Sequence, residues 1–217
     1  MRGKSGNACY SNSPYNNRDF IEKALPDRKS TVATEKQLKQ QAIFRGYLDM
    51  EMALSDSIKV GFPLNGKHLQ GRQLFKRENS KVRSITAVVN RTTVDGEEMV
   101  AIAYKVDYDL LVVASGSLKA PGVTCEGNAE EQKLTFTNKV PGVFGYECNA
   151  TDKLYAVVCD TVENMSELVP LGTRGEDTPV VHTLPDGFTT GNLQVYVFAT
   201  LQNGKRASRS RHLSSPA

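Results

Sequence analysis

The sequence is poor in the residues that anchor large cores and in long apolar runs. None of its 217 residues is tryptophan, aromatic residues make up 7% and apolar residues 39%. This composition supports one folded body of about 100–150 residues plus an appendage. No stretch approaches about 18 uninterrupted apolar residues, so we expect no transmembrane segment. The opening residues are followed by polar residues rather than an apolar stretch, so we also expect no signal peptide.

Cysteine and histidine are also scarce, which limits metal and disulfide chemistry. The four cysteines and three histidines contain no C-x-x-C pair and form no zinc-binding pattern. The favoured interpretation is that Cys125, Cys148 and Cys159 are buried in strands as small apolar side chains, with Cys9 free near the N-terminus. The alternative is a disulfide between two of the three later cysteines, which requires an oxidising compartment.

No pattern in the sequence is typical of a catalytic site. The histidines at 68, 182 and 212 have no partners at positions that indicate a catalytic triad, and nucleotide-binding glycine loops are absent. Adjacent acidic residues lack the regular spacing of a calcium loop and are interpreted as solvent-exposed charge. These pairs are Glu97–Glu98, Asp107 with Asp109, and Glu176–Asp177. We therefore expect a protein that is not an enzyme, with no catalytic residues, no cofactor and no metal.

Charge is distributed unevenly along the chain. Residues 1–91 carry 17 Lys or Arg against 8 Asp or Glu, residues 92–204 carry 6 against 16, and the last thirteen residues carry four bases and no acid. Opposite charges on two parts of one chain favour head-to-tail association of copies. The competing interpretation is nucleic-acid binding by the basic stretch 72–91. Its single aromatic residue, Phe75, offers no stacking platform, so a solvent-exposed helix face is favoured there.

The first thirty residues are polar and are interrupted by Gly3, Gly6, Pro14 and Pro26. Such a segment buries too little apolar surface to form its own core, so we predict an extended N-terminal arm over 1–30. Fixing its backbone costs about 1–2 kcal/mol per residue, which favours an arm that is held by a neighbouring subunit.

A helical segment is predicted over 31–84. Thr34 and Gln37 have the spacing of a capping box, and the sequence Gly61-Phe62-Pro63 predicts the end of the first helix. Between them lies a stripe of apolar residues at helical spacing, interpreted as a packing face. The stripe consists of Ile43, Tyr47, Met50, Leu54 and Ile58. A second helix is predicted over about 72–84, although Asn79-Ser80 interrupts its pattern.

From residue 85 onward, short β-branched runs alternate with turn signals. This pattern predicts a mainly β protein with an α-helical N-terminal part, an α+β fold, in which 85–217 forms an antiparallel β-sandwich of the immunoglobulin or fibronectin type III kind. Asp95-Gly96 and Asn203-Gly204 are type I′ hairpin dipeptides. We therefore expect 85–94 to pair with 97–105, and 193–201 with 205–213.

The run 193–201 alternates strictly between two faces. One face is predicted to point into the core; it consists of Leu193, Val195, Val197, Ala199 and Leu201. The other face carries Tyr196 and Phe198, and is expected either to be a shared surface or to be covered by the helices.

Several short motifs occur in a fixed order over nearly the whole chain. They are Gly3-Lys4-Ser5-Gly6-Asn7, Pro26, Thr34 with Gln37 and Gln41, Ile58-Lys59-Val60-Gly61-Phe62, Leu184-Pro185-Asp186-Gly187-Phe188, and Asn203-Gly204-Lys205 with Ser208. In this order they resemble an uncharacterised family of proteins of similar length from Bacteroidota and their phages. The chain departs from that family at 8–11 and at Gln41-Ala42. The resemblance implies an N-terminal arm, a helix and a β-sandwich in a phage or bacterial-surface setting, and it transfers no catalytic residue.

Together these observations predict a structural or assembly protein. The resemblance makes it a phage virion component, such as a capsid decoration, connector or tail protein, made in the bacterial cytoplasm. Its expected partners are copies of itself or other virion proteins, not a membrane. The residues expected to bind neighbouring subunits are Gly3, Gly6, Asn7, Tyr10, Tyr15, Arg18 and Phe20. The alternative is a cell-associated immunoglobulin-like module that binds glycan or protein through Tyr104, Tyr108, Tyr146 and Tyr155.

Overall fold

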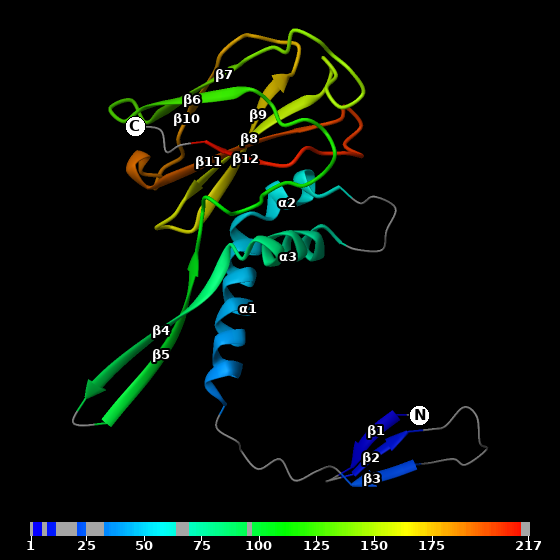
Figure 1. Ribbon diagram of the computed structural model, residues 1–217, viewed down its shortest axis with the longest axis vertical. Coiled ribbons are helices and arrows are strands. Elements are labelled where there is room, and N and C mark those ends of the chain that lie inside the picture. The colour runs from blue at the N-terminus through cyan, green and yellow to red at the C-terminus, as the bar shows by residue number, and fades with distance from the viewer. Residues whose placement is uncertain are drawn as a thin grey trace. The chain divides into compact units, whose positions relative to one another are not determined.

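The computed structural model describes residues 2–5, 8–11, 21–24, 33–63, 70–94 and 97–213. By its contacts the chain divides into two units, Met1–Glu35 and Lys36–Ala217. The larger unit combines helices with antiparallel sheets, as Figure 1 shows, so the predicted mainly β, α+β class is confirmed. Within the described residues, no helix has both the length and the apolar character to span a membrane.

The N-terminal unit contains three short strands that pair with one another. They are β1 (Arg2–Ser5), β2 (Ala8–Ser11) and β3 (Ile21–Ala24). β2 is central and pairs antiparallel with both neighbours. The predicted arm thus contains three paired strands, and its contact with a neighbouring subunit stays a prediction. Strand pairing satisfies backbone N–H and C=O groups without an apolar core, which is why a polar segment can adopt it.

Three helices follow. They are α1 (Glu35–Ala53), α2 (Ser55–Gly61) and α3 (Gly71–Val82). α1 begins directly after Thr34, and α2 ends before Phe62-Pro63, as predicted. The single helix expected there is divided at Leu54, whose N–H still donates to the Met50 carbonyl at 2.9 Å. In the predicted stripe, Ile43 is partly buried and the other members are buried, which confirms the packing face.

Asn79 does not interrupt α3; its side chain joins this helix to the segment around Val112. The side chain is fully buried, and its Nδ2 donates to the carbonyls of Phe75 and Val112 at 3.0 and 2.8 Å. Its Oδ1 accepts bonds from the Val112 N–H and the Ser84 hydroxyl. All four hydrogen-bonding positions of the amide are thus used, so this polar residue is compatible with burial.

After α3 the chain forms a two-stranded antiparallel ribbon. Its strands are β4 (Ile85–Val94) and β5 (Glu97–Val106), and the register runs from Ile85 opposite Val106 to Val94 opposite Glu97. The predicted hairpin is confirmed, while its turn, 95–96, lies outside the described residues. Residues 123–213 form two further sheets, which we call the β body. The ribbon pairs with neither of them, so the prediction of a sandwich that starts at residue 85 is wrong. Figure 1 shows the ribbon leaving that body.

The remaining strands form two sheets. One has the order β10-β7-β6, and the other has the order β12-β11-β8-β9. Their strands are β6 (Val123–Asn128), β7 (Lys133–Asn138), β8 (Lys153–Asp160), β9 (Met165–Thr173), β10 (Val180–Thr183), β11 (Leu193–Thr200) and β12 (Arg211–Leu213). β11 pairs with β12 from Val195 to Val197, and Thr200 bridges Ala207, which confirms the second predicted hairpin.

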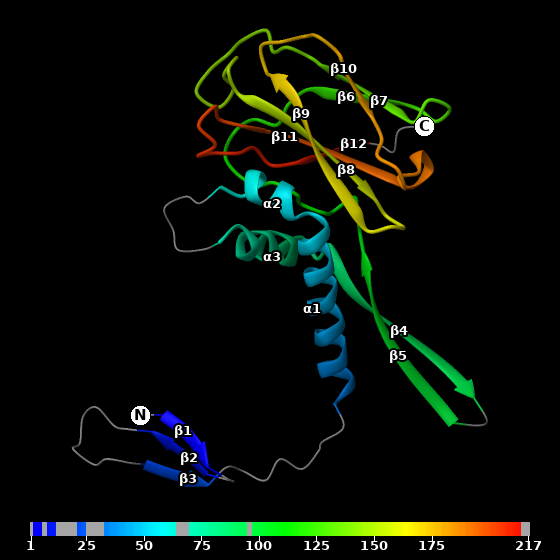
Figure 2. The same ribbon diagram turned by 180° about the vertical axis from the view of Figure 1, so that it is seen from behind.

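The two faces of β11 border two different cores. Leu193, Val195, Val197 and Ala199 belong to the inter-sheet core, the apolar cluster that the two sheets share. Tyr196 and Phe198 belong to the helix-side core, together with residues of the helices such as Leu54. α2 lies below this sheet in Figures 1 and 2. Of the two alternatives for the aromatic face, a shared surface or a face covered by the helices, the structure shows the second.

A buried ion pair ties the end of β9 to the start of β8. Arg174 and Asp152 have side chains only 1% exposed, and Arg174 Nε donates to Asp152 Oδ2 at 3.2 Å. Arg174 Nη2 also donates to the Lys119 carbonyl at 2.7 Å. Because both charged groups are buried away from water, removing either residue would leave the other as an unpaired buried charge.

Cys125, Cys148 and Cys159 are all free thiols, so the alternative of a disulfide among them is wrong. Cys159 is buried in β8, Cys125 is half-buried in β6, and Cys148 is buried in a loop rather than in the expected strand. Burial raises the pKa of the Cys125 and Cys159 thiols to about 12, so both are neutral and unreactive at neutral pH. Cys9 lies in β2.

Candidate interaction site

The ribbon meets α1 at a close crossing that depends on a glycine. A Cβ atom at Gly46 would lie 2.7 Å from Ile85 Cγ2 and 2.8 Å from the Tyr104 ring. Only a residue without a side chain lets the two elements approach this closely. We call the surface formed by residues 40–49 of α1 together with β4 and β5 the helix–ribbon surface.

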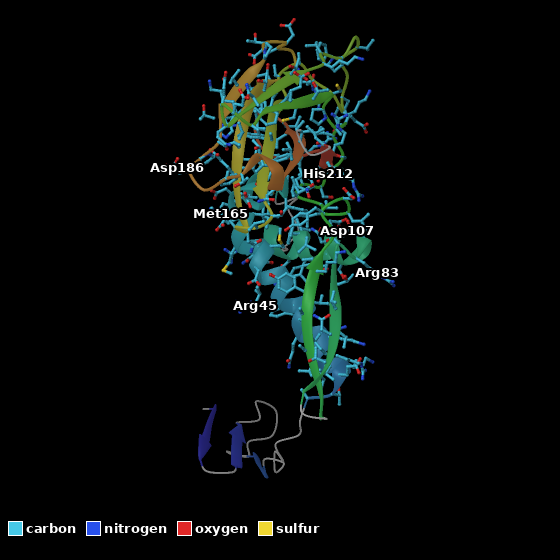
Figure 3. All side chains as sticks on the ribbon, turned by 90° about the vertical axis from the view of Figure 1, so that its left-hand side faces the viewer. Arg45, Arg83, Asp107, Met165, Asp186 and His212 are labelled. Atoms are coloured by element: carbon cyan, nitrogen blue, oxygen red, sulfur yellow. The ribbon has the colours of Figure 1, made fainter. Side chains whose placement is uncertain are left out.

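A polar contact fixes the same crossing. The Tyr104 hydroxyl donates to Asp49 Oδ2 at 2.8 Å, and Arg45 on the same helix forms an ion pair with Asp49 at 3.0 Å. Burial, and then the nearby Asp49 carboxylate, raise the pKa of Tyr104 to about 12. The phenol therefore stays protonated and remains a donor throughout the physiological range. Figure 3 labels Arg45 on α1 and Arg83 where α3 passes into the ribbon.

A groove of about 400 Å³ lies between α1, the end of α3 and the start of β4. Its apolar lining includes Ile43, Phe44 and Ile85, and Arg83 lies at its polar side. The Phe44 ring is 55% exposed, and the Lys76 Nζ lies 4.9 Å from its centroid. The ring therefore adds exposed apolar surface to the groove, with a cation beside it.

Beyond the crossing the ribbon has little cover from the described part of the chain. Its described side chains from Asn90 to Thr92 and at Val100 and Ala101 are exposed, and Val100 is 42% accessible. Figures 1 and 2 both show the ribbon diverging from α1. Among the described strands, β4 and β5 pair only with each other, so each has one unpaired edge. The helix–ribbon surface thus offers apolar side chains and free strand edges.

A second exposed apolar feature is the loop between β7 and β8. Val143, Phe144 and Tyr146 are 84%, 41% and 81% exposed. Gly145 and Cys148 exchange two backbone hydrogen bonds, which places Tyr146 at the corner of a tight turn. The guanidinium of Arg206 lies 4.7 Å from the Tyr146 ring centroid and is bonded to the Ser117 hydroxyl.

Of the seven predicted subunit-binding residues, the structure describes the backbone of two. Gly3 of β1 and Tyr10 of β2 are register partners. The others, Gly6, Asn7, Tyr15, Arg18 and Phe20, lie outside the described residues. The prediction that they contact a neighbouring subunit stays a prediction.

Of the four tyrosines in the alternative recognition module, Tyr146 alone is exposed. Tyr104 is partly buried at the ribbon crossing, and Tyr108 and Tyr155 pack against the helix-side core. Tyr155 stacks on Phe198 with ring centroids 5.4 Å apart. A glycan surface built from all four is therefore not formed.

Several acidic side chains stabilise local turns. Asp107 Oδ1 accepts the N–H groups of Asp109 and Leu110, and Glu176 Oε2 accepts that of Thr173. The described part of the chain holds no group of three or more His, Cys, Asp or Glu residues that could bind a metal.

Two described histidines are in polar pairs. His182 contacts Glu167 at 3.0 Å. His212 lies between Asp109, at 3.0 Å, and Gln194, at 2.7 Å. Each of these contacts joins side chains from different elements, so the pairs support the packing of strands and turns.

Sequence reasoning missed the helix–ribbon surface. Gly46 was a usable signal, because a glycine inside a helical pattern often marks a close packing contact. Val100 and Phe44 carried no signal, since an exposed apolar residue looks like a core residue in sequence.

No protein-family model, no curated protein and no solved structure matches the chain.

Proposed function

We propose that the protein is a non-enzymatic structural protein that assembles with neighbouring subunits through its helix–ribbon surface. The observation that carries this proposal is the outer half of the ribbon, which is fully paired as a hairpin and yet exposed on its described side chains. A two-stranded hairpin is only marginally stable alone in water, and this one is anchored to α1 at its base, near Gly46 and Tyr104. A neighbouring subunit that covers the outer half would stabilise it.

The strand edges support the same proposal. An unpaired edge presents a row of N–H and C=O groups that another strand can bind, and edges left open in a free chain invite association. The edges of β4 and β5 supply two such rows, next to the exposed Phe44 and Val100 side chains. Backbone pairing would give affinity, and the apolar side chains would give register.

For the β body we propose an immunoglobulin-like sandwich of the fibronectin type III kind. The support is the strand order: the first, second and fifth of its strands form one sheet, and the third, fourth, sixth and seventh form the other. The inter-sheet core lies between residues of both sheets. Such a body is a rigid carrier on which contact elements can be mounted.

We further propose that the assembly is a phage virion component, as a capsid decoration, connector or tail protein. The support is the order of the six motifs that resemble the Bacteroidota and phage family. The N-terminal segment would add a second contact, with Gly3, Tyr10 and the other predicted residues on a neighbouring copy. The uneven charge along the chain favours contacts between unlike ends of two copies.

Shortening the ribbon tests the assembly proposal. Replacing residues 91–100 by Asn-Gly joins the register partners Asn90 and Ala101 through a type I′ turn. We expect this variant to keep its far-ultraviolet spectrum and cooperative unfolding but to lose oligomers, as measured by light scattering on a sizing column. The matched control is Phe144→Ser with Tyr146→Ser, which removes the other exposed aromatic feature and should leave the oligomer intact.

Two outcomes contradict the proposal. One is a wild-type chain that stays monomeric at high concentration. The other is a shortened variant whose oligomer mass equals that of the wild type. Deleting residues 2–30 in a separate variant tests the N-terminal contact, which would be refuted by an unchanged oligomer.

The second candidate function is recognition of another molecule through the loop that carries Tyr146. The exposed ring, held by Arg206, is the observation that favours it. Binding of the wild-type chain to a glycan array or to a bacterial surface that Tyr146→Ala abolishes would support recognition. Absence of binding by the wild type would contradict it.

A further inference from the structure

A hollow of about 420 Å³ lies between α2, the start of β8 and the turn that follows β11. Three lysines from these three elements line it: Lys59, Lys153 and Lys205. In Figures 1 and 2, α2 lies against the sheet that contains β8 and β11. Residues far apart in the sequence therefore contribute three lysine side chains to the lining of one depression.

The charge of this hollow is not balanced from within. Among the described residues that line it there is no carboxylate. The Lys59 ammonium pairs with Asp56 at 2.8 Å, and that carboxylate is 73% exposed and lies outside the lining. The side chains of Lys153 and Lys205 make no ion pair with the described residues.

The floor of the hollow is held rigidly. The Tyr155 ring stacks on the buried Phe198, and Thr200 and Pro63 are buried beneath it. The lysine side chains are long and exposed, so they can adjust to a ligand over a fixed base. The charges of Lys153 and Lys205 have no carboxylate partner in the lining, and a multivalent anion would compensate both of them.

We propose that this lysine hollow binds a phosphate group. Lysine binds phosphate as a compact charge with three donors, and an open hollow of this size accommodates more than one phosphate unit. The phosphate comes either from a free polyphosphate or from the backbone of a nucleic acid, which share this chemistry. The inference is independent of the assembly proposal, since the hollow contains no residue of the helix–ribbon surface.

Titration of the full-length chain with inorganic tripolyphosphate at low ionic strength tests the proposal. Isothermal calorimetry should show binding that weakens as sodium chloride is raised, because exposed charges are screened by salt. Lys153→Gln with Lys205→Gln should weaken this binding about tenfold or more, at the level expected for two exposed charge contacts. The matched control is Lys119→Gln with Lys139→Gln, which removes the same charge from exposed positions outside both the hollow and the helix–ribbon surface, and should change affinity less than about twofold.

A second titration, with a single-stranded oligothymidylate, identifies the source of the phosphate. Loss of both affinities in the hollow variant would indicate a site for backbone and free phosphate alike, whereas loss of the tripolyphosphate affinity alone would indicate a free polyphosphate. The proposal is overturned if the wild type binds neither probe, or if the control pair loses as much affinity as the hollow pair. Far-ultraviolet spectra of all variants establish that each is folded.

Discussion

β11 and β5 are both long antiparallel strands, but the protein uses them in opposite ways. β11 is paired on both edges, by β8 and β12, and nearly all its residues are buried. β5 is paired only with β4, and its described side chains are exposed or partly buried. A strand inside the sheet stabilises the fold. The ribbon strand extends beyond what the described fold covers, which is why we assign it to contact between subunits.

The physical difference lies in the number of surfaces that each strand buries. Both faces of β11 contribute apolar area to cores, at about 25 cal/mol per Å² removed from water. The outer ribbon contributes hydrogen bonds between its own strands, and each of these adds only about 0.5–1.5 kcal/mol net. Substitutions in β11 should therefore act on folding, and substitutions in the outer ribbon should act on association.

The largest effect is expected at Phe198, in the middle of β11. Its side chain is fully buried and stacks on Tyr155. Phe198→Ala should lower the free energy of unfolding by about 3–5 kcal/mol, because it leaves a cavity in the helix-side core. Urea unfolding followed by circular dichroism measures the loss, with the exposed Val143→Ala as control. A loss below about 1 kcal/mol would contradict the contrast between the two strands.

The next effect is expected where the ribbon meets the body. Gly46→Val places methyl groups where Ile85 and Tyr104 already lie, so one of the two elements has to shift. Overpacking of this kind costs about 1–3 kcal/mol of unfolding free energy. Gly142→Ala is the matched control, because an added Cβ there meets nothing within 4 Å. Equal stability of the two variants would show that the ribbon does not depend on this crossing.

The features of the fold that the sequence predicted are those whose signal lies in one short stretch of the chain. Asp95-Gly96 predicted the ribbon's own pairing, and the alternation over 193–201 predicted which face of β11 enters the inter-sheet core, because a strand's period is fixed by its backbone. It left open whether the helices cover the other face, and Leu201, expected in the core, is only partly buried. The separation of the ribbon from the two sheets could not be predicted, because it depends on β4 and β5 not pairing with any strand of those sheets. Asn79 was interpreted as a helix interruption because its partner Val112 lies far along the chain.

The candidate surfaces were less accessible than the fold. The lysine hollow assembles Lys59, Lys153 and Lys205 from distant parts of the sequence, where each lysine alone resembles ordinary surface charge. The N-terminal segment was correctly judged to lack an apolar pattern. Its strand pairing depends on backbone hydrogen bonds, which leave little trace in a polar sequence.

A smaller effect, with a pH dependence, is expected at Tyr104. Tyr104→Phe removes the hydrogen bond to Asp49 and should cost about 1 kcal/mol at neutral pH. In the unfolded chain the phenol titrates near its usual pKa of 10.0, whereas in the fold its pKa is about 12. The unfolded state therefore releases its proton first, and stability is lost as pH rises from 10 toward 12. This loss should be smaller in Tyr104→Phe, and identical pH profiles would contradict the raised pKa.

The smallest effect on folding is expected at Val100, which is 42% exposed on the outer ribbon. Val100→Asp should change the unfolding free energy of the monomer by less than about 0.5 kcal/mol, because it leaves no cavity and buries no charge in the free chain. Its effect on association should be large, since a neighbouring subunit that covers this position would have to desolvate a carboxylate. Sedimentation velocity over a concentration series separates the two quantities. A variant that unfolds like the wild type and dissociates at higher concentration places Val100 inside the contact, whereas unchanged association would move the contact away from β5.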